Sequence, residues 1–187
     1  MYMSSRKPIT MENLKTIWIL SGAPGSGKST WVHKNCLPNS LIISRDQIRF
    51  NMLKDSDDYF KHEDEVWREY IKQISNAIRN PFIDNIYLDA THLNEKSRNK
   101  VLNSLGNLVK NININVIYFD ICAAVCCQRN ALRSGRAKVP ENTIINMMYS
   151  FQTPTFNEKY KYNEIWRIDA RGNVEKEKRK NECCYSV

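Results

Sequence analysis

A glycine-rich segment with one lysine and two serines is the part of the chain best suited to chemistry. Residues 22–29 read Gly-Ala-Pro-Gly-Ser-Gly-Lys-Ser and fit the spacing G-x-x-x-x-G-K-[S/T]. Backbone N–H groups in such a loop face a phosphate chain, and a helix that begins at the lysine adds partial positive charge. Lys28 would then reach the β- and γ-phosphates of a nucleotide, and the Ser29 hydroxyl would serve Mg²⁺. A turn that merely joins a strand to a helix is the alternative.

An aspartate and an arginine follow the next apolar run, residues 40–44. Ligands of parallel sheets bind where the strands end, and a helix that starts at Asp46 would place Asp46 and Arg49 on one face. The carboxylate would take the proton of an acceptor hydroxyl, and the guanidinium would bind a phosphate beside it. Asp46 would serve equally well as a helix cap with Arg49 in solvent, and these residues alone leave that choice open.

Basic residues recur in the last third of the chain without an acidic residue between them. They are Arg129, Arg133, Arg136 and Lys138. Arginines four residues apart on a helix project to the same side. A mobile cationic lid over a triphosphate is therefore expected, because it would stabilise the charge on a transferring phosphoryl group. A solvated basic helix end is the alternative.

Two classes of nucleotide-binding protein lack their signatures here. The guanine-reading pattern N-K-x-D is absent, since Asn99-Lys100 is followed by Val101-Leu102. The third expected strand ends in a single Asp89 rather than in the acidic pair with which hydrolytic motors activate water. Both absences favour a kinase over a molecular switch or a motor.

The elements that must position these residues alternate between strands and helices. Strands are expected over residues 16–21, 40–44, 85–89, 114–119 and 164–168. Helices are expected over about 28–36, 58–79, 95–109, 123–133 and 141–151. This alternation predicts an α/β fold with a parallel β-sheet covered by helices on both faces, plus a helical lid. One domain is expected over residues 16–170, with a flexible leader over 1–15 and a charged, disordered tail over 171–187.

Composition adds bounds on partners and compartment. The chain has 187 residues, of which 42% are hydrophobic, and its formal net charge of +8 favours polyanions such as nucleotides and nucleic acid. No run approaches the ~20 apolar residues of a membrane span, so no membrane partner is expected. Residues 1–15 lack the apolar core of a secretory signal, and no C-x-x-C pair occurs. A reducing compartment, cytoplasm or nucleus, is therefore expected, while the oligomeric state leaves no signature.

Four segments in this order resemble the 5′-polynucleotide kinase domain family of P-loop kinases, typified by the bacteriophage enzyme. Residues 22–31 resemble its P-loop, including the tryptophan at the end of the segment. Ser44-Arg45-Asp46-Gln47-Ile48-Arg49 is similar to the family's segment with the catalytic aspartate. Asp89-Ala-Thr-His-Leu-Asn94 resembles its strand-end aspartate and turn, and residues 129–140 resemble its lid.

The resemblance implies transfer of the γ-phosphate of ATP, with Mg²⁺, to the 5′-hydroxyl end of RNA or DNA. It gives catalytic roles to Lys28, Asp46 and Arg133, an acceptor site to Asp46, Arg49 and Asp89, and metal binding to Ser29. The residues expected to contact ATP are Gly22, Ala23, Pro24, Gly25, Ser26, Gly27, Lys28, Ser29, Thr30, Arg129 and Arg133. The alternatives are a kinase of a nucleoside, sugar or antibiotic, and a nucleic-acid-binding ATPase module.

Overall fold

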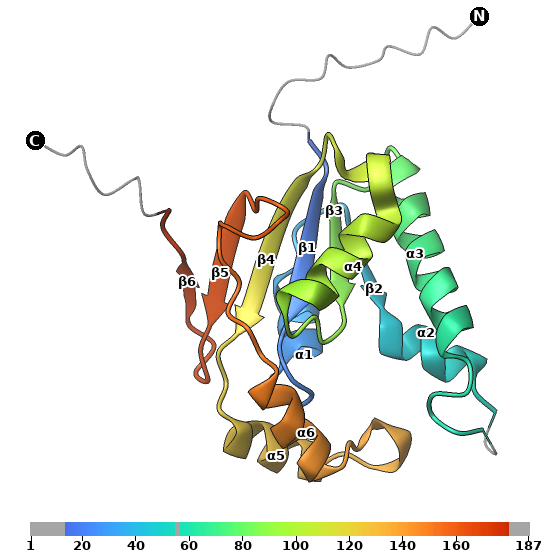
Figure 1. Ribbon diagram of the computed structural model, residues 1–187, viewed down its shortest axis with the longest axis vertical. Helices are drawn as coiled ribbons and strands as arrows, with labels where there is room; N and C mark the ends of the chain where they lie inside the picture. The colour runs from blue at the N-terminus through green and yellow to red at the C-terminus, as the bar shows by residue number, and fades with distance from the viewer. Residues whose placement is uncertain (1–13, 55–56, 180–187) are drawn as a thin grey trace, which may run out of the picture.

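A six-stranded sheet forms the centre of the computed structural model, which describes residues 14–54 and 57–179 (Figure 1). The strands are β1 (Thr16–Ser21), β2 (Ser40–Ser44), β3 (Asn85–Asp89), β4 (Asn113–Phe119), β5 (Glu164–Ile168) and β6 (Val174–Lys176). Their spatial order is β2-β3-β1-β4-β5-β6, and all neighbouring pairs are parallel except β5 and β6. Because β1 to β5 run in one direction, their carboxyl ends share one edge of the sheet.

Helices cover both faces of this sheet. They are α1 (Lys28–Asn35), α2 (Arg45–Met52), α3 (Glu63–Arg79), α4 (Glu95–Leu105), α5 (Ala123–Ala131) and α6 (Glu141–Tyr149). Short 3₁₀ segments occur over Gly106–Val109 and Gly135–Ala137. Figure 1 shows α3 and α4 across one face and α1 behind the sheet, while α5 and α6 lie beyond the edge at which the strands end. The expected architecture, a parallel sheet between helices with a helical lid, is confirmed.

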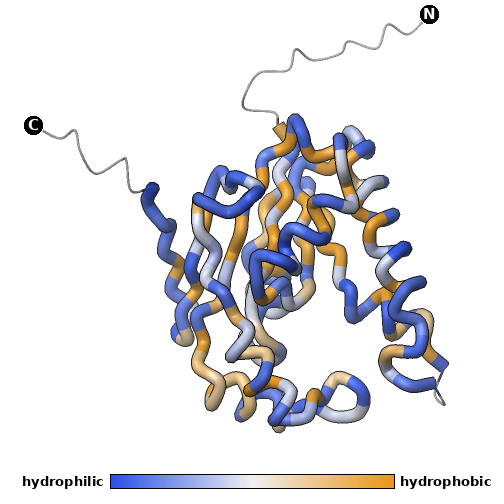
Figure 2. Tube along the Cα trace, in the orientation of Figure 1, coloured by the Kyte–Doolittle hydropathy of each residue, from blue (hydrophilic) through white to orange (hydrophobic). Residues whose placement is uncertain are grey.

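The alternation of side chains along β1 divides the core into two layers. Ile17 and Ile19 pack with Val66 of α3, whereas Trp18 and Leu20 pack with Val32 of α1. All six side chains are buried. Successive residues of a strand point to opposite faces, so a central strand of a two-sided sheet must be apolar throughout. Figure 2 shows this hydrophobic run along the inner strands and mixed colouring on the helices around them.

Helix α3 begins at Glu63, five residues later than the sequence suggested. The preceding residues form turns instead, because two acidic side chains bond to the backbone there. Asp57 accepts from the backbone N–H of Lys54 at 3.0 Å, and Asp58 accepts from that of Phe60 at 3.3 Å. Aspartate favours such local turns over helix interiors. Asp57 and Asp58 therefore shape the loop before α3 rather than its first turn.

The tail expected from residue 171 begins with ordered structure. Strand β6 pairs antiparallel with β5, and the turn between them is closed around Asp169, which accepts from Arg171 N at 2.8 Å and Asn173 N at 2.9 Å. The domain thus extends past residue 170, at least to the end of β6. Residues 1–13 of the expected leader and residues 180–187 of the expected tail lie outside the described residues.

A buried ion pair ties α4 to the segment before β5. Arg98 is fully buried, and its Nε donates to Glu158 Oε2 at 3.1 Å. The Tyr162 hydroxyl donates to the same oxygen at 2.6 Å. Residues 93–98 lead from this pair back to the strand end at Asp89, so the pair supports the edge of the sheet at which a ligand would bind.

Replacing Glu158 with alanine should lower the free energy of unfolding by about 3–5 kcal/mol, because it leaves the Arg98 charge buried and unpaired. Chemical denaturation would measure the loss. Glu175→Ala is the matched control: its ion pair with Arg167 is exposed, at 69% and 40% of the side-chain surfaces, and its loss should change stability by about 0–1 kcal/mol. Equal losses in the two variants would contradict this account of Arg98.

Within residues 14–54 and 57–179, no helix is both long enough and apolar enough to cross a membrane. The cysteines in this part of the chain, Cys36, Cys122, Cys126 and Cys127, are free thiols.

Candidate active site

Three of the expected site segments meet where the strands end. The glycine-rich loop follows β1, Asp89 ends β3, and α2 follows β2 without a break. Strand β3 lies between β1 and β2, and Ser44 at the end of β2 is in register with Asp89. The sheet order therefore brings together residues that are far apart in sequence, at the lower ends of the strands in Figure 1.

The glycine-rich loop is folded as a phosphate-binding loop. Gly25 and Gly27 have φ of +83° and +96°, and α1 begins at Lys28 directly after them. The Lys28 ammonium donates back to the carbonyls of Gly22 at 2.8 Å and Ala23 at 3.0 Å. The Ser26 hydroxyl is buried and has no hydrogen-bond partner among the described residues. A loop with glycines in the left-handed conformation and a hydroxyl without a hydrogen-bond partner fits an oxygen-rich ligand such as a phosphate chain.

Gly25 is the residue of this loop least able to accept a side chain. A Cβ there would lie 2.3 Å from the backbone oxygen of Cys126, and the left-handed φ adds strain. Gly25→Ala should therefore push the loop away from α5 at a cost of about 1–3 kcal/mol, which weakens ATP binding about 5- to 150-fold. Titration calorimetry with ATP would measure the change.

Gly106→Ala is the control for the effect of the backbone alone. Gly106 also has a positive φ, of +54°, but a Cβ there meets nothing within 4 Å. This variant should lose some stability and keep its ATP affinity. A Gly25→Ala protein that binds ATP like the wild type would contradict the proposed loop geometry.

Ser29 and Asp89 form a pair of oxygen ligands beside the loop. The Ser29 hydroxyl donates to Asp89 Oδ2 at 2.7 Å, and Asp89 is buried. Hydroxyl and carboxylate oxygens suit Mg²⁺, which binds few protein groups and keeps its other positions for water and phosphate. The residues present thus fit the ion expected at Ser29. Their contact also favours a place for Asp89 on the metal side of the site, next to the donor phosphates.

The pKa of Lys28 reflects its burial and the charged groups around it. Burial lowers the pKa of Lys28 to about 8, and the carboxylates of Asp89 and Asp46 counteract that fall. The Arg133 guanidinium lowers the pKa of Lys28 further. An acidic group from α2 and a basic group from the lid therefore both lie within electrostatic range of the Lys28 ammonium.

This lowered pKa predicts that ATP affinity depends on pH. Below about pH 8 the free protein already carries the Lys28 charge, whereas above it the amine must take up a proton when it binds phosphate. Affinity should therefore fall about 20-fold between about pH 7.5 and pH 9.5. Titration calorimetry over that range would measure it. Cys126→Ala should keep this pH dependence of ATP affinity, which excludes titration of the neighbouring thiol as its cause, whereas Lys28→Met should remove it. A wild-type affinity that does not change with pH would contradict the assignment to Lys28.

Asp46 and Arg49 form the ion pair that helical spacing predicts. Arg49 Nη1 lies 2.6 Å from Asp46 Oδ1, and the Asp46 side chain is 64% exposed. The cap of α2 is Ser44, whose hydroxyl accepts from the backbone N–H of Gln47 at 3.3 Å. Asp46 is therefore not occupied as a helix cap, and Arg49, at 5% exposure, is not a solvated side chain.

Two residues that the sequence analysis did not single out complete this cluster. The Tyr59 hydroxyl donates to Asp46 at 3.1 Å and accepts from Arg49 at 3.0 Å. Glu63, the first residue of α3, accepts from Arg49 Nη2 at 2.8 Å and also pairs with Arg45. The guanidinium of Arg49 is thus held by groups from three segments, and a phosphate bound there would have to replace Tyr59 or Glu63.

The lid carries the second set of arginines. Helix α5 ends at Ala131, so Arg129 lies on the helix and Arg133 on the loop after it. Arg129 donates to the carbonyls of Ser26 and Ala170, at 3.4 and 3.3 Å, while Arg133 donates to the carbonyl of Ala137 at 3.4 Å. The expectation that both arginines extend from one helix is wrong, because the helix stops short of Arg133.

Asn130 fixes the base of the lid loop. This buried side chain donates to the carbonyl of Val139 at 2.7 Å and accepts from its N–H at 3.0 Å. The loop between them, residues 131–138, includes Arg136, which donates to the carbonyl of Lys54 after α2. The lid therefore reaches from the phosphate-binding loop to the side of the site that holds Asp46.

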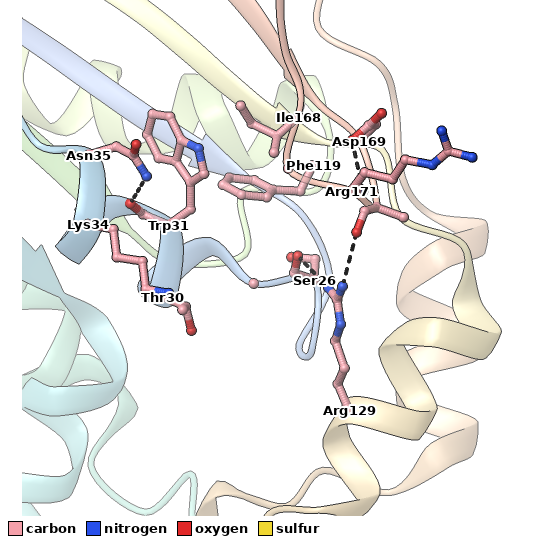
Figure 3. A pocket seen from close by; sticks show the side chains of 13 residues that line it. Ser26, Thr30, Trp31, Lys34, Asn35, Phe119, Arg129, Ile168, Asp169 and Arg171 are labelled. Carbon is pink, nitrogen blue, oxygen red and sulfur yellow. Dashed lines mark hydrogen bonds between the residues drawn. The ribbon is translucent and has the colours of Figure 1, made fainter.

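A cavity of about 380 Å³ opens beside the phosphate-binding loop (Figure 3). Trp31 of α1, Phe119 and Ile168 give it an apolar wall, while Arg129 and the turn between β5 and β6 close the other side. Ser26, Gly27 and Thr30 line it from the loop and α1. A flat apolar group joined to a phosphate chain suits this site. The turn residues were missed because they fell in the expected tail, although Gly172 between two short β-like runs is a hairpin signal.

The histidine of the segment 89–94 is structural. His92 Nδ1 pairs with the carbonyl of Leu20 at 2.9 Å, and the carbonyl of His92 accepts from the Ser21 hydroxyl at 2.8 Å. Burial lowers the pKa of His92 to about 4. The ring is therefore neutral near pH 7, and it anchors the strand that leads into the phosphate-binding loop.

Solved structures share this fold. A chain of the Pnkp1/Rnl/Hen1 RNA repair complex matches with a TM-score of 0.62 and 22% identity, over 78% of this chain and 46% of that one. A fungal RNA kinase matches with a TM-score of 0.59 and 12% identity, over 89% and 40% of the two chains. A sugar kinase from Janibacter sp. HTCC2649 matches with a TM-score of 0.55 and 15% identity, over 84% and 86%.

The chain thus spans about half or less of the two RNA-directed proteins, and identities this low establish the fold alone. No curated protein sequence matches it. Residues 17–154, well over half of the chain, match the AAA domain family. Together with the phosphate-binding loop, the strand order and the lid, this match shows that the protein belongs to the AAA domain family of P-loop kinases.

Proposed function

We propose that the protein transfers the γ-phosphate of ATP to the 5′-hydroxyl end of RNA or DNA. The observation that carries this proposal is the position of Asp46. Its carboxylate is exposed and does not cap α2, and it lies at the edge of the sheet that also holds Lys28 and Asp89. A hydroxyl acceptor needs a base on the side opposite the donor phosphates. Of the two described carboxylates that act on the Lys28 ammonium, Asp89 is buried, whereas Asp46 is exposed and paired with an arginine.

Each residue then has a defined task. Asp46 takes the proton of the 5′-hydroxyl as that oxygen bonds to the γ-phosphorus, and the bond from this phosphorus to the leaving oxygen of ADP breaks. Lys28 and Arg133 stabilise the negative charge that spreads over the phosphoryl oxygens. Ser29 and Asp89 would hold Mg²⁺, which neutralises charge on the β- and γ-phosphates when bound. The apolar cavity beside Arg129 takes the adenine of ATP.

Arg49 holds Asp46 in position and supplies positive charge beside the acceptor. Its ion pair fixes the orientation of the carboxylate, and Glu63 and Tyr59 fix the guanidinium in turn. A phosphate on the 3′ side of the acceptor nucleoside would bind Arg49 in exchange for one of these partners. An Arg49→Ala enzyme should then lose more activity on a nucleoside 3′-phosphate than on a plain nucleoside.

Charge supports a nucleic-acid acceptor over a neutral small molecule. The net charge is +8, and the lid adds Arg133, Arg136 and Lys138 along the path between the donor and the acceptor sides. Cationic surfaces of this kind bind the phosphate backbone of nucleic acid. The matches to a chain of an RNA repair complex and to a fungal RNA kinase agree with this acceptor, whereas the sugar kinase shows that the same fold also serves small molecules.

Label transfer tests the proposal directly. The protein is incubated with γ-labelled ATP and, in separate reactions, a 5′-hydroxyl oligonucleotide, the same oligonucleotide with a 5′-phosphate, a nucleoside, and a sugar. The expected result is strong label on the 5′-hydroxyl oligonucleotide, weak label on the nucleoside, and none on the 5′-phosphorylated oligonucleotide or the sugar. Label on the nucleoside or the sugar in preference to the oligonucleotide identifies a small-molecule kinase. Release of inorganic phosphate that needs nucleic acid but labels no acceptor identifies an ATPase module.

A further inference from the structure

Aromatic side chains gather next to Asp46, on the segment between α2 and α3. The ring of Tyr59 lies 6.1 Å from that of Phe50 and 4.9 Å from that of Phe60, in edge-to-face contacts. Phe60 is 65% exposed. None of these rings lines the cavity proposed for the adenine, and Phe60 leaves an apolar surface in solvent beside the Tyr59 that bonds to Asp46.

The exposed ring is held in place by the residues beneath it. The Arg49 guanidinium lies 4.6 Å from the ring centre of Tyr59 and 5.8 Å from that of Phe60. The turn is braced by Asp57, which accepts from the backbone N–H of Lys54 at 3.0 Å and from the Lys61 ammonium at 2.7 Å. The Tyr59 hydroxyl joins the same unit to Asp46. Phe60 thus lies in the turn over residues 57–62, which shares its contacts with the acceptor site.

We propose that Phe60, backed by Tyr59, stacks with the nucleobase at the 5′ end of the acceptor, an inference that rests on the proposed kinase function. A nucleoside whose 5′-hydroxyl lies at Asp46 extends away from the donor, and Phe60 is one aromatic ring away from that carboxylate. Stacking on an aromatic ring accepts any base, because every base has a π-face.

The test compares two 5′-hydroxyl oligonucleotides that differ only in their terminal residue. One carries an ordinary nucleoside, and the other carries a tetrahydrofuran in place of the terminal sugar and base, which keeps the 5′-hydroxyl and lacks the base. Both are phosphorylated by the wild type and by the Phe60→Ala, Phe60→Trp and Phe82→Ala variants. Phe82→Ala is the matched control, because Phe82 is another exposed phenylalanine, at 83%, beyond the other end of α3.

The wild type should show a KM about 5- to 150-fold higher for the abasic acceptor, the usual effect of losing one stacked base. Phe60→Ala should raise KM for the ordinary acceptor by the same factor, leave kcat nearly unchanged, and have no effect on the abasic acceptor. Phe60→Trp should restore the difference between the two acceptors. Phe82→Ala should behave like the wild type on both.

Two outcomes overturn the inference while the kinase function stands. A Phe60→Ala variant with an unchanged KM on both acceptors removes the exposed ring from acceptor binding. A variant whose KM rises equally on both acceptors assigns Phe60 to shaping the loop. Absence of label on any oligonucleotide with the wild type is a different result, since it contradicts the proposed function itself.

Discussion

Replacing Asp46 with alanine will lower kcat for phosphorylation of a 5′-hydroxyl oligonucleotide by about 10²- to 10⁴-fold, the usual contribution of a general base. The affinity for ATP should stay nearly unchanged, because the donor phosphates lie on the side of Lys28 and the lid. The fold should also survive. The Asp46 side chain is 64% exposed, and Arg49 keeps its bonds to Glu63 and Tyr59 after the change.

Two variants separate catalysis from simple loss of an ion pair. Asp120→Ala removes another half-exposed carboxylate, which pairs with Arg167 at 2.6 Å outside the site, and should leave kcat unchanged. Tyr59→Phe removes one hydrogen bond to Asp46 but keeps the carboxylate, so it should cost much less than Asp46→Ala. Steady-state kinetics with labelled ATP and calorimetry of ATP binding provide the readouts. Wild-type turnover by Asp46→Ala would remove Asp46 from the mechanism.

The parts of the site that could be predicted from the sequence are those whose structure depends on a short stretch of neighbouring residues. The phosphate-binding loop is set by eight consecutive residues and the strand before it, because backbone curvature depends on the local glycines. The Asp46–Arg49 pair follows from helical spacing, once a helix is known to begin there. The buried strands were predictable because a two-sided sheet needs uninterrupted apolar runs.

The parts that sequence missed depend on contacts between distant segments. Glu63 reaches Arg49 from 14 residues further along, and only the packing of α3 against α2 brings the two together. Strand β6 consists of three exposed residues with no apolar alternation, and it forms because β5 offers a free edge. In both cases the local sequence resembles a solvated, charged segment, and its structure comes from its neighbour.

The two arginines of the lid are a further example. Their spacing in the sequence suggested one shared role, whereas their contacts suggest a different role for each. Arg129 bonds to Ser26 and Ala170 at the wall of the cavity proposed for the adenine. Arg133 is exposed, lies beyond the end of α5, and lowers the pKa of Lys28 through its charge. The first position suits binding of the donor, and the second suits the charge that develops on the transferring phosphoryl group.

Arg133→Ala should therefore lower kcat by roughly 10³-fold, at the lower end of the effect of an arginine that stabilises phosphoryl transfer, with a small change in KM for ATP. Arg129→Ala should mainly raise KM for ATP, by about tenfold for the loss of charge-assisted hydrogen bonds. Arg68→Ala, on an exposed part of α3, is the control and should change neither. Steady-state kinetics at saturating acceptor would measure both constants.

If the two lid variants show the same fall in kcat and the same rise in KM, the lid acts as one basic patch and the separate role of Arg133 is wrong. A split between them would show that a single loop residue, positioned by the clamp of Asn130 on Val139, supplies the charge on which transfer depends.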